Sequence, residues 1–372
     1  MNKKPRVALI YDRVNTPYGG AEFVLQQLHK LYPEAPLFTS VYDQEKAKWT
    51  AGWDVRPSWL QGIPGAKTHH RSFVPFMPIA FESVDLRPFE IVISITSAEA
   101  KGVLTRPDQL HICYLLTPTR YLWSHPEEYL KSSSAFIRKP VFRYLKWWDE
   151  AASLRPDIYV PISKVVAQRC KQFYGREAAP VIYPPVLPPC TDTKPVQPLP
   201  EKFYLVVSRL VGYKKIGLAI QACQELGRHL VIVGDGPERS AYQAMSNPSW
   251  IHFHGHAPIS DLGYYFEHCE AFLAPGEEDF GIAAIEAQQC GKPVILASKS
   301  GAAELIAHKK TGFHLENETV EAVRNALQEC ERIRWSSKAI RQQVSVTQPT
   351  HFRQQFQDFV GKSWENWQKI AT

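Results

Sequence analysis

Two glutamates eight positions apart, Glu278 and Glu286, are the residues whose type and spacing most suggest chemistry. A Phe280-Gly281 turn lies between them, and a run of helix formers over 282–290 follows. This spacing predicts that Glu278 lies in a loop and Glu286 in the first turns of a helix. Free backbone N–H groups at a helix start bind phosphate or hydroxyl oxygens. The pattern favours a polyhydroxylated, phosphorylated ligand, although a glutamate that merely caps the helix is an alternative.

Cationic residues suited to a diphosphate follow another apolar run. Arg209 and Lys214 come just after the predicted strand 203–208. Ligands of parallel sheets bind at the carboxyl ends of the strands, so both side chains are expected on the ligand side. A guanidinium forks onto phosphate oxygens, and an ammonium adds a mobile point charge. Two solvated surface cations are the alternative interpretation.

Glycine pairs also follow two predicted strands. Gly19 and Gly20 lie between the strand 7–11 and a helix, where glycine lets backbone N–H groups approach a phosphate. Their spacing is not that of a nicotinamide fingerprint, and a simple tight turn is the alternative. Gly234 and Gly236 follow a later strand and are expected to shape the nucleotide side of the same site.

No metal site or cofactor is predicted. His252, His254 and His256 alternate along a predicted strand, a spacing that could bind a metal ion. No carboxylate or cysteine completes the set, however, and the chain has no D-x-D motif. We therefore expect these histidines to be structural and a catalytic divalent cation to be unnecessary.

Short apolar runs alternate with helical patterns through both halves of the chain. Buried strands are predicted at 7–11, 89–94, 110–115, 157–162, 203–208, 230–234, 250–254, 271–274 and 293–297, and helices at 21–31, 216–226, 238–245 and 282–290. Continuous apolar strands separated by helices indicate parallel sheets covered on both faces. Two Rossmann-like α/β domains are therefore expected.

A proline-rich segment separates the two halves. Proline stiffens the chain and disfavours both helix and sheet, so a linker is predicted over 184–200. The first domain is then 1–183 and the second 201–349. The last stretch, 350–372, carries aromatic residues at roughly helical spacing and is expected to form a terminal helix.

The composition describes an ordinary globular protein. The 372 residues are 44% hydrophobic and 22% charged, with a formal net charge of +6, and no apolar run approaches the ~18 residues that span a bilayer. The mildly basic balance suits an anionic partner such as a membrane lipid, a diphosphate or nucleic acid. Seven dispersed cysteines without a C-x-x-C pair favour reduced thiols, and the first apolar run is too short for a signal peptide. A cytoplasmic location is therefore predicted.

Several segments resemble, in order, the retaining nucleotide-sugar glycosyltransferases of family 4. They are Tyr18–Glu22, Trp148-Asp149, Tyr183–Val186, Ser208–Lys215, Val233–Glu238 and Pro275–Ile295. The similarity runs from about Val7 to Leu315 and points to the bacterial mannosyltransferase-like branch of polysaccharide and O-antigen assembly. It implies a GT-B fold, with two Rossmann-like domains facing across a cleft and a terminal helix that crosses back onto the first domain. It also implies a nucleotide-diphosphate sugar as substrate.

The resemblance also assigns roles to individual residues. Glu278, Arg209 and Lys214 are implied to be catalytic. The implied donor-binding residues are Gly20, Gly234, Gly236, His256, Phe280, Gly281, Ile282 and Glu286, and the acceptor-side residues are Gly19 and Arg120. The family's usual mechanism is a front-face substitution in which a donor phosphate oxygen helps to deprotonate the acceptor hydroxyl. No enzyme nucleophile is assigned, because preorganised charge around the diphosphate would supply most of the acceleration.

One residue departs from the family pattern. Relatives reading Cys-Tyr-x-His-Thr-Pro place the histidine near the 6-hydroxyl of the donor sugar, whereas Cys113–Pro118 carries Leu116 at that position. Leucine packs against a methyl group but cannot bond a hydroxyl, and an unpaired hydroxyl costs roughly 1–3 kcal/mol. GDP-mannose is the donor that the family favours, and a 6-deoxyhexose such as rhamnose or fucose is the hypothesis that Leu116 favours. A pentose donor is a further alternative. Another is that a neighbouring polar residue takes the place of the histidine as the hydrogen-bond partner of the 6-hydroxyl.

The stretch 136–148 mixes basic and aromatic residues, as segments at a membrane interface do. A helix that packs its aromatic residues into the first domain is an equal alternative. The resemblance implies a glycan acceptor on a polyprenyl-diphosphate carrier at the inner membrane face. Transfer onto modified DNA bases, or a non-catalytic protein that binds a glycan or lipid carrier, are alternatives, and nucleic acid is the less favoured partner.

Overall fold

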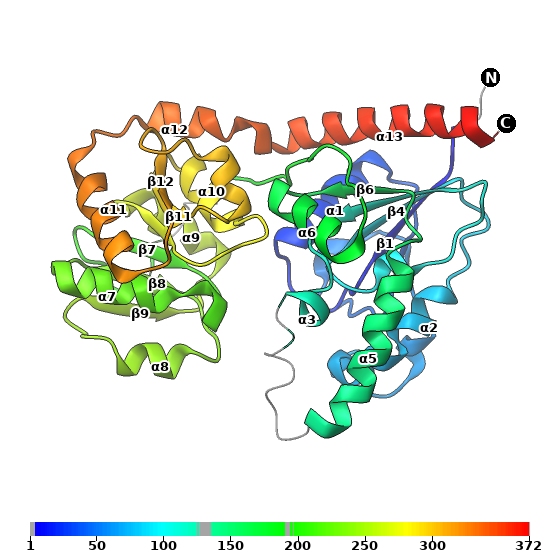
Figure 1. Cartoon of the computed structure of the whole chain (residues 1–372), viewed down its shortest axis with the longest axis horizontal. Coiled ribbons are helices and arrows are strands. Elements are labelled where there is room, and N and C mark those ends of the chain that lie inside the picture. The colour runs from blue at the N-terminus through cyan, green and yellow to red at the C-terminus, as the bar shows by residue number, and fades with distance from the viewer. Residues whose placement is uncertain (1–3, 125, 127–134, 190–193, 196, 372) are drawn as a thin grey trace. The chain divides into compact units, whose positions relative to one another are not determined.

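The computed structural model describes residues 4–124, 126, 135–189, 194–195 and 197–371. The chain divides into two compact units, and each is described separately (Figure 1). The first unit comprises Met1–Pro185 together with Thr350–Thr372, and the second comprises Val186–Pro349. Within the described residues each unit is built on one six-stranded parallel sheet, as the alternating pattern predicted.

The first sheet has the strand order β3-β2-β1-β4-β5-β6. Its strands are β1 (Val7–Tyr11), β2 (Leu37–Thr39), β3 (Val55–Pro57), β4 (Ile91–Thr96), β5 (Leu110–Leu115) and β6 (Ile158–Pro161). Every residue of β1, β4 and β5 is buried, because these central strands are covered on both faces. The predicted strands 7–11 and 110–115 are confirmed to the residue.

Helices and short 3₁₀ turns connect the strands of the first unit. The helices are α1 (Gly20–Leu31), α2 (Met77–Glu82), α3 (Arg120–Trp123), α5 (Ala135–Ala152), α6 (Lys164–Tyr174) and α13 (Pro349–Ala371). The 3₁₀ turns used below are η3 (His70–Phe76) and η4 (Ala100–Gly102). The predicted helix 21–31 is confirmed as α1.

The last helix of the chain, α13, packs on the first unit, as the resemblance implied (Figure 1). Phe352 and Phe356 lie on one side of this helix, and both are fully buried. Their rings meet the buried ring of Tyr114 in β5 edge-on, with centroid distances of 5.8 and 5.7 Å. Arg353 also donates a hydrogen bond of 2.5 Å to Gln27 in α1. The first unit is therefore completed by the end of the chain.

The second sheet has the strand order β12-β11-β10-β7-β8-β9. Its strands are β7 (Tyr204–Val207), β8 (Leu230–Val233), β9 (Ile251–Gly255), β10 (Phe272–Ala274), β11 (Val294–Ala297) and β12 (Gly312–Leu315). Its helices are α7 (Ile216–Leu226), α8 (Arg239–Ala244), α9 (Ile259–His268), α10 (Ile282–Gln289), α11 (Val320–Arg332) and α12 (Ser337–Gln343). The predicted strands and helices of this half are confirmed, and the strand β12 and the helices α9, α11 and α12 are additions.

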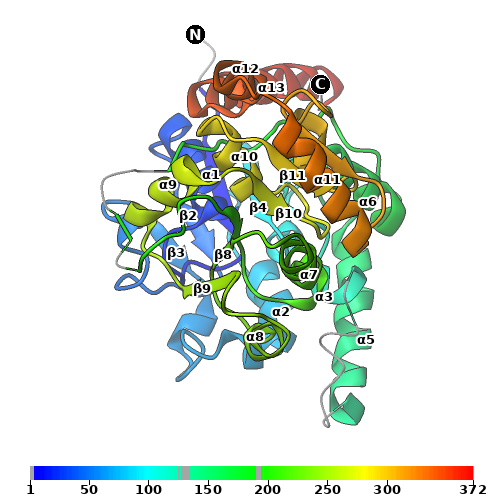
Figure 2. The same ribbon diagram turned by 90° about the vertical axis from the view of Figure 1, so that its left-hand side faces the viewer.

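Helices α7 and α11 lie side by side over one face of the second sheet (Figure 2). Alternate strand residues point into the core beneath them, for example Leu273 of β10. The next residue along that strand, Phe272, points to the other face and packs against Phe266 of α9, with a centroid distance of 5.7 Å. Each face is thus covered, which leaves the strand ends as the accessible positions for a ligand.

Candidate functional site

The residues predicted to bind the donor gather at one edge of the second sheet. They follow the carboxyl ends of four neighbouring strands: Arg209 and Lys214 after β7, Gly234 and Gly236 after β8, His256 after β9, and Glu278, Phe280 and Gly281 after β10. Parallel strands end at the same edge, so residues far apart in sequence are brought into one neighbourhood.

Lys214 and Glu278 form an ion pair at this edge. The Lys214 ammonium lies 2.7 Å from a carboxylate oxygen of Glu278, and the two side chains are only 16% and 22% exposed. The backbone of Gly276 presses so closely on Lys214 that a Cβ there would lie 2.6 Å from the Lys214 Cα. Sequence reasoning did not select Gly276, although the Pro275-Gly276 turn before the glutamates was the available signal.

The loop from Glu278 to Gly281 is held in place by the segment 300–302. The backbone N–H of Glu278 donates to the Ser300 hydroxyl at 3.1 Å, and that of Gly301 donates to the Glu278 carbonyl at 3.0 Å. The loop ends at Gly281, whose φ of +95° favours glycine. Gly281 is the cap residue that precedes α10, and it provides no side-chain cap, so the first N–H groups of the helix, including that of Ile282, point toward the space in front of it.

Arg209 presents a cation on the same edge. Its side chain is exposed, and its guanidinium makes no hydrogen bond or ion pair with the residues that the structure describes. It differs in this respect from Lys214, whose charge is already balanced by Glu278. An uncompensated guanidinium at the same sheet edge as a helix N-terminus is suited to an anionic ligand.

Gly234 and Gly236 are glycines because of packing. A Cβ at Gly234 would overlap the carbonyl group of Ser208, and a Cβ at Gly236 would overlap that of Leu210. Gly234 also has a φ of +132°, which side chains rarely adopt. The two glycines therefore let the loop after β8 lie against the segment 208–210, which includes Arg209.

Glu286 lies in α10 and is partly buried. Removal from solvent raises the pKa of its carboxyl group from 4.5 to about 7, because burial disfavours the charged form. No side-chain hydrogen bond or ion pair of Glu286 is present among the described residues. It is thus a carboxyl group whose hydrogen-bonding capacity is still available to a ligand.

The histidines near this edge point to different partners. His252 lies 3.1 Å from a ring nitrogen of His229, and His254 lies 2.8 Å from the hydroxyl of Tyr265. His256 follows the strand and is exposed. Within the described parts of the chain, no three histidine, cysteine or carboxylate side chains converge as metal ligands. The absence of a metal from the reaction stays a prediction.

The predicted residues of the first unit lie at the carboxyl edge of its own sheet. Gly19 precedes α1, where a Cβ would lie 2.9 Å from a carboxylate oxygen of Glu22, and Gly20 begins the helix. Glu22 is buried and accepts a 2.9 Å hydrogen bond from Tyr11. Leu116 directly follows β5 and is partly buried. The predicted site residues of this unit therefore come from two different strand ends.

Arg120 is the first residue of α3, four positions after Leu116. Asp12, which was not predicted, links segments at the same carboxyl edge of the first sheet. This buried carboxylate accepts hydrogen bonds from the Thr96 hydroxyl at 2.7 Å and from the Ala100 amide at 2.8 Å. Its position directly after an apolar strand was the available signal.

Comparison with known proteins agrees with this architecture. Residues 191–344 match the family model of glycosyl transferases group 1. Three solved structures cover 96–98% of this chain at 17–18% identity. They are the lipopolysaccharide outer core galactosyltransferase WaaB (TM-score 0.67, 99% of that chain), Anabaena HepE in complex with UDP and glucose (0.65, 100%) and a sucrose-phosphate synthase from Thermosynechococcus elongatus (0.68, 100%). The chain has the GT-B fold, and most of its second unit matches the model of glycosyl transferases group 1.

Curated relatives match only part of the chain. A GDP-mannose-dependent alpha-(1-6)-phosphatidylinositol monomannoside mannosyltransferase from Mycolicibacterium smegmatis is 28% identical over 202 residues, which are 46% of this chain and 52% of that protein. A 2-deoxystreptamine N-acetyl-D-glucosaminyltransferase from Niallia circulans is 27% identical over 125 residues, 31% of this chain and 32% of that protein. The match thus spans about half the length of the first relative. The resemblance to GT-B glycosyltransferases is confirmed, while membership of family 4 and retention of configuration stay predictions.

Proposed function

We propose that this protein transfers a hexosyl unit from a nucleotide-diphosphate sugar to a glycan acceptor with retention of configuration. The observation that carries the proposal is the Lys214–Glu278 pair, 2.7 Å apart, at the sheet edge that also holds the start of α10 and Arg209, whose guanidinium has no partner among the described residues. This arrangement supplies two cations and several N–H donors where a diphosphate would develop charge as it leaves. The matching group 1 domain contains all of these residues.

The individual side chains take distinct parts in this proposal. Arg209 and Lys214 hold the donor diphosphate, and the first amides of α10 add hydrogen bonds to its oxygens. Glu278, which Lys214 orients, accepts hydrogen bonds from the sugar ring near the reacting carbon. The Glu286 carboxylate accepts hydrogen bonds from the ribose hydroxyls. The acceptor hydroxyl attacks from the face that the diphosphate leaves, and the departing phosphate oxygen takes its proton.

The donor is proposed to be GDP-mannose or a GDP- or dTDP-linked 6-deoxyhexose. A GDP-mannose-dependent relative supports the first, because it matches 46% of this chain. Leu116 supports the second, because an apolar side chain at the end of β5 offers no partner to a 6-hydroxyl. The acceptor is proposed to be a lipid-linked glycan, which agrees with the phosphatidylinositol-linked acceptor in the relative's name.

A calorimetric binding panel tests this function. GDP, UDP and dTDP are titrated first, and the mannosyl, glucosyl, fucosyl and rhamnosyl forms of the bound nucleotide follow. Selective binding of one nucleotide, tighter with one sugar, is the expected result. A hundredfold kinetic preference for GDP-mannose over every 6-deoxy donor would remove the hypothesis based on Leu116. Failure of all ligands to bind would overturn the transferase proposal.

Nucleotide binding is expected to strengthen as the pH rises toward 7 and to level off above it. The raised pKa of Glu286, about 7, means that its carboxyl group is largely protonated below that pH, whereas ribose hydroxyls bond best to the carboxylate. Binding below pH 7 therefore releases a proton, and affinity falls by up to about tenfold per pH unit. In the unliganded protein, Glu286 contributes stability below pH 4.5 that is lost as the pH rises through about 7.

Calorimetry between about pH 5.5 and 8.5 measures this dependence. The Glu286→Gln variant is the control, because it keeps the shape of the side chain and removes its titration. The ligand phosphates titrate equally in both proteins, so the difference between the two profiles isolates Glu286. Parallel profiles for the two proteins would contradict the assignment of Glu286 to the ribose.

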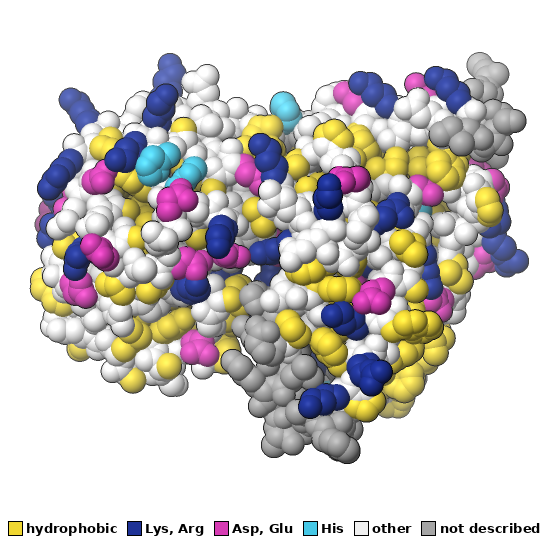
Figure 3. All heavy atoms as spheres, viewed as in Figure 1, with side chains coloured by type: hydrophobic (Ala, Val, Ile, Leu, Met, Phe, Trp, Pro, Cys, Tyr) yellow, Lys and Arg dark blue, Asp and Glu magenta, His cyan; other side chains and the backbone are white. Residues whose placement is uncertain are grey.

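We also propose that the first unit binds an anionic membrane surface through α5 and α2. Part of the stretch 136–148 packs inward, because Trp148 is 5% exposed and donates a hydrogen bond to Glu82. Trp147, in contrast, is 67% exposed. Phe76 and Ile79, just before and within α2, are exposed too, and Figure 3 shows hydrophobic and basic side chains together over these elements. Such a mixture is typical of an interfacial surface.

Reversing the charge of Lys139 and Arg143 is expected to weaken binding to anionic vesicles at least about tenfold, since each basic residue near such a surface contributes about 1 kcal/mol. Both side chains are exposed on α5. Vesicle co-sedimentation measures the change. The control reverses Arg87 and Arg106, exposed arginines paired with neighbouring aspartates, and so changes the net charge equally. Equal losses in both variants would show a general charge effect and contradict this surface. Among the described residues, no helix meets the length and hydrophobicity that crossing a bilayer requires.

A further inference from the structure

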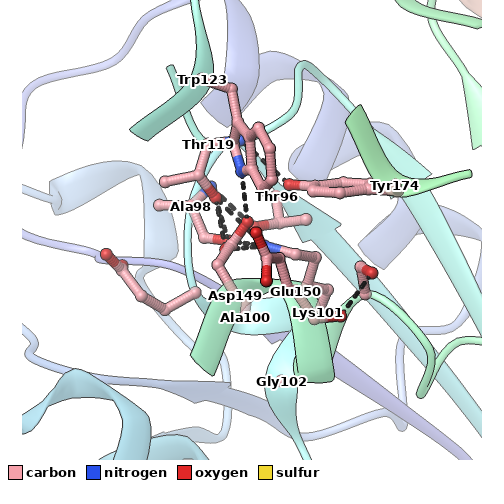
Figure 4. Close-up of polar contacts among 12 residues, drawn as sticks. Thr96, Ala98, Ala100, Lys101, Gly102, Thr119, Trp123, Asp149, Glu150 and Tyr174 are labelled. Carbon is pink, nitrogen blue, oxygen red and sulfur yellow. Dashed lines mark hydrogen bonds and ion pairs between the residues drawn. The ribbon is translucent and has the colours of Figure 1, made fainter. Parts of the chain in front are cut away.

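A fully buried ion pair lies inside the first unit, between Lys101 and Asp149. Lys101 belongs to η4, which follows β4, and Asp149 belongs to α5 (Figure 4). The ammonium lies 2.5 Å from a carboxylate oxygen, and each side chain is 1% exposed. Water therefore screens neither charge, and the surrounding protein must satisfy both.

The protein satisfies the lysine completely. An ammonium group has three donors, and Lys101 uses them on the Ala98 carbonyl at 2.7 Å, the Thr119 hydroxyl at 3.1 Å and Asp149. The ring of Tyr174 also faces the ammonium, with its centroid 5.3 Å away. Each of these partners comes from a different segment of the chain, so the lysine fixes several segments at once.

The aspartate holds α3 at both ends (Figure 4). Its first carboxylate oxygen accepts a hydrogen bond of 2.7 Å from the hydroxyl of Thr119, the residue that precedes α3. Its second oxygen accepts one of 2.8 Å from the indole of Trp123, the last residue of α3. The Thr119 amide donates in addition to the Tyr174 hydroxyl at 3.1 Å. Besides the bond from Lys101, the hydrogen bonds to the Asp149 side chain thus come from the four-residue helix α3 and the residue that precedes it.

The segment held in this way connects β5 with α3, and it carries Leu116 and Arg120. A second attachment reaches the same segment, because Tyr121 donates a 2.6 Å hydrogen bond to the buried carboxylate of Glu99, two residues before Lys101. Helix α5 lies close enough to η4 that a Cβ at Gly102 would overlap the ring of Trp148. Ion pairing, hydrogen bonds and packing therefore hold α5, η4 and the loop 116–123 together.

Stability alone does not account for such a pair. Two charges lose their hydration on burial, and apolar residues of similar volume often give a folded state of equal or greater stability. What the polar pair adds is direction, because each hydrogen bond fixes an angle that apolar contacts would leave free. The bonds to Thr119 and Trp123 fix the geometry of α3 and its preceding loop.

We propose that Lys101 and Asp149 are positioning residues that fix the loop 116–123, and with it Leu116 and Arg120, for glycosyl transfer. The catalytic part of this inference rests on the proposed function, whereas the ordering of the loop does not. Neither residue contacts the substrates. Their removal is expected to lower turnover through the geometry of the loop while leaving the donor site of the second unit intact.

The decisive variant replaces both partners together, as Lys101→Met with Asp149→Leu. Single replacement leaves a buried charge without its partner, and such variants are expected to unfold at clearly lower temperature. The double variant is expected to melt within about 4 °C of the wild type. Its loop amides, 116–123, should exchange hydrogen at least about tenfold faster, and kcat should fall at least about tenfold with a donor KM changed less than about threefold.

A matched control makes the same replacements in an exposed pair of the first unit, as Arg106→Met with Asp108→Leu. This control should leave loop exchange and kcat unchanged. A double variant that keeps wild-type loop exchange and wild-type kcat would overturn the positioning role. A wild-type protein that transfers no sugar would overturn the proposed function instead, and the exchange of the loop would still decide whether the pair holds it.

Discussion

Replacing Glu278 by glutamine is expected to lower the rate of sugar transfer at least about 100-fold while the protein stays folded. The side chain keeps its size, but the negative charge that faces Lys214 at 2.7 Å is lost, so Lys214 is no longer fixed on the diphosphate side of the site. Removing one preorganised electrostatic partner from an active site typically costs about 100- to 1000-fold in rate. Steady-state kinetics with the donor identified by the binding panel measure the loss.

The neighbouring residue provides the control for this experiment. Glu277 is 39% exposed and lies 3.8 Å from Lys299, so Glu277→Gln removes an equal charge from the same loop. This variant should retain activity within about threefold, since an exposed pair contributes little. If Glu278→Gln retains more than a tenth of the activity, or if the two variants lose activity equally, the assignment of Glu278 is wrong. Nucleotide binding in both variants shows whether the site remains formed.

Replacing Phe356 by alanine is expected to destabilise the first unit by about 3–5 kcal/mol. Phe356 is fully buried between Phe352 and Tyr114, with ring centroids 5.6 and 5.7 Å away. Truncation removes the ring from the interior and leaves a cavity beside β5. Equilibrium unfolding in urea measures the total loss. Hydrogen exchange is expected to place that loss in β5 and α13, with β8 of the second unit retaining its protection.

An adjacent substitution separates the loss of packing from a change in helix propensity. Gln357 is exposed on the same helix, and Gln357→Ala should change stability by less than about 0.5 kcal/mol. If Phe356→Ala costs less than about 1 kcal/mol, α13 does not contribute to the core of the first unit in the way described. Equal loss of protection in β5 and β8 would likewise contradict that role.

The regular part of the fold was predictable because burial on both faces leaves a local signature. Strands such as Val7–Tyr11 are continuous apolar runs, and a run of that kind needs no knowledge of its neighbours. The strands that were missed are short or lie at a sheet edge. Val55–Pro57, for example, is a partly exposed edge strand of three residues, and Gly312–Leu315 contains a glycine and a histidine. Their strand conformation depends on pairing with a neighbour rather than on local pattern.

The donor-side residues were predictable individually, but the contacts between them were not. Lys214 and Glu278 were each selected from their own segment, and their ion pair exists only because β7 and β10 are neighbours in the sheet. Gly234 and Gly236 were expected to shape a ligand pocket, whereas the atoms nearest to them belong to the backbone of the adjacent strand end. Glycine composition alone does not distinguish these two reasons for a missing side chain.

The buried pair of the first unit had no local signal. Lys101 and Asp149 are 48 residues apart, and each is an ordinary charged residue in its own segment. The only local signal at Asp149 is a Trp-Asp dipeptide that resembles a family pattern. The residues that donate hydrogen bonds to it, Thr119 and Trp123, come from a third segment. Long-range polar networks of this kind become visible only once the topology is known.

The place of α13 in the first unit has a consequence for how the chain is made. A ribosome completes β5 and the rest of the first sheet before it starts on Val186–Pro349, and Phe352 and Phe356 emerge only after that whole unit. At ordinary rates of synthesis the delay is roughly ten to thirty seconds. During this interval the apolar surface around Tyr114 lacks its cover. The nascent first unit is therefore the species on which a chaperone would act, and mutations in α13 should reduce yield from cells more than they reduce the activity of protein that has folded.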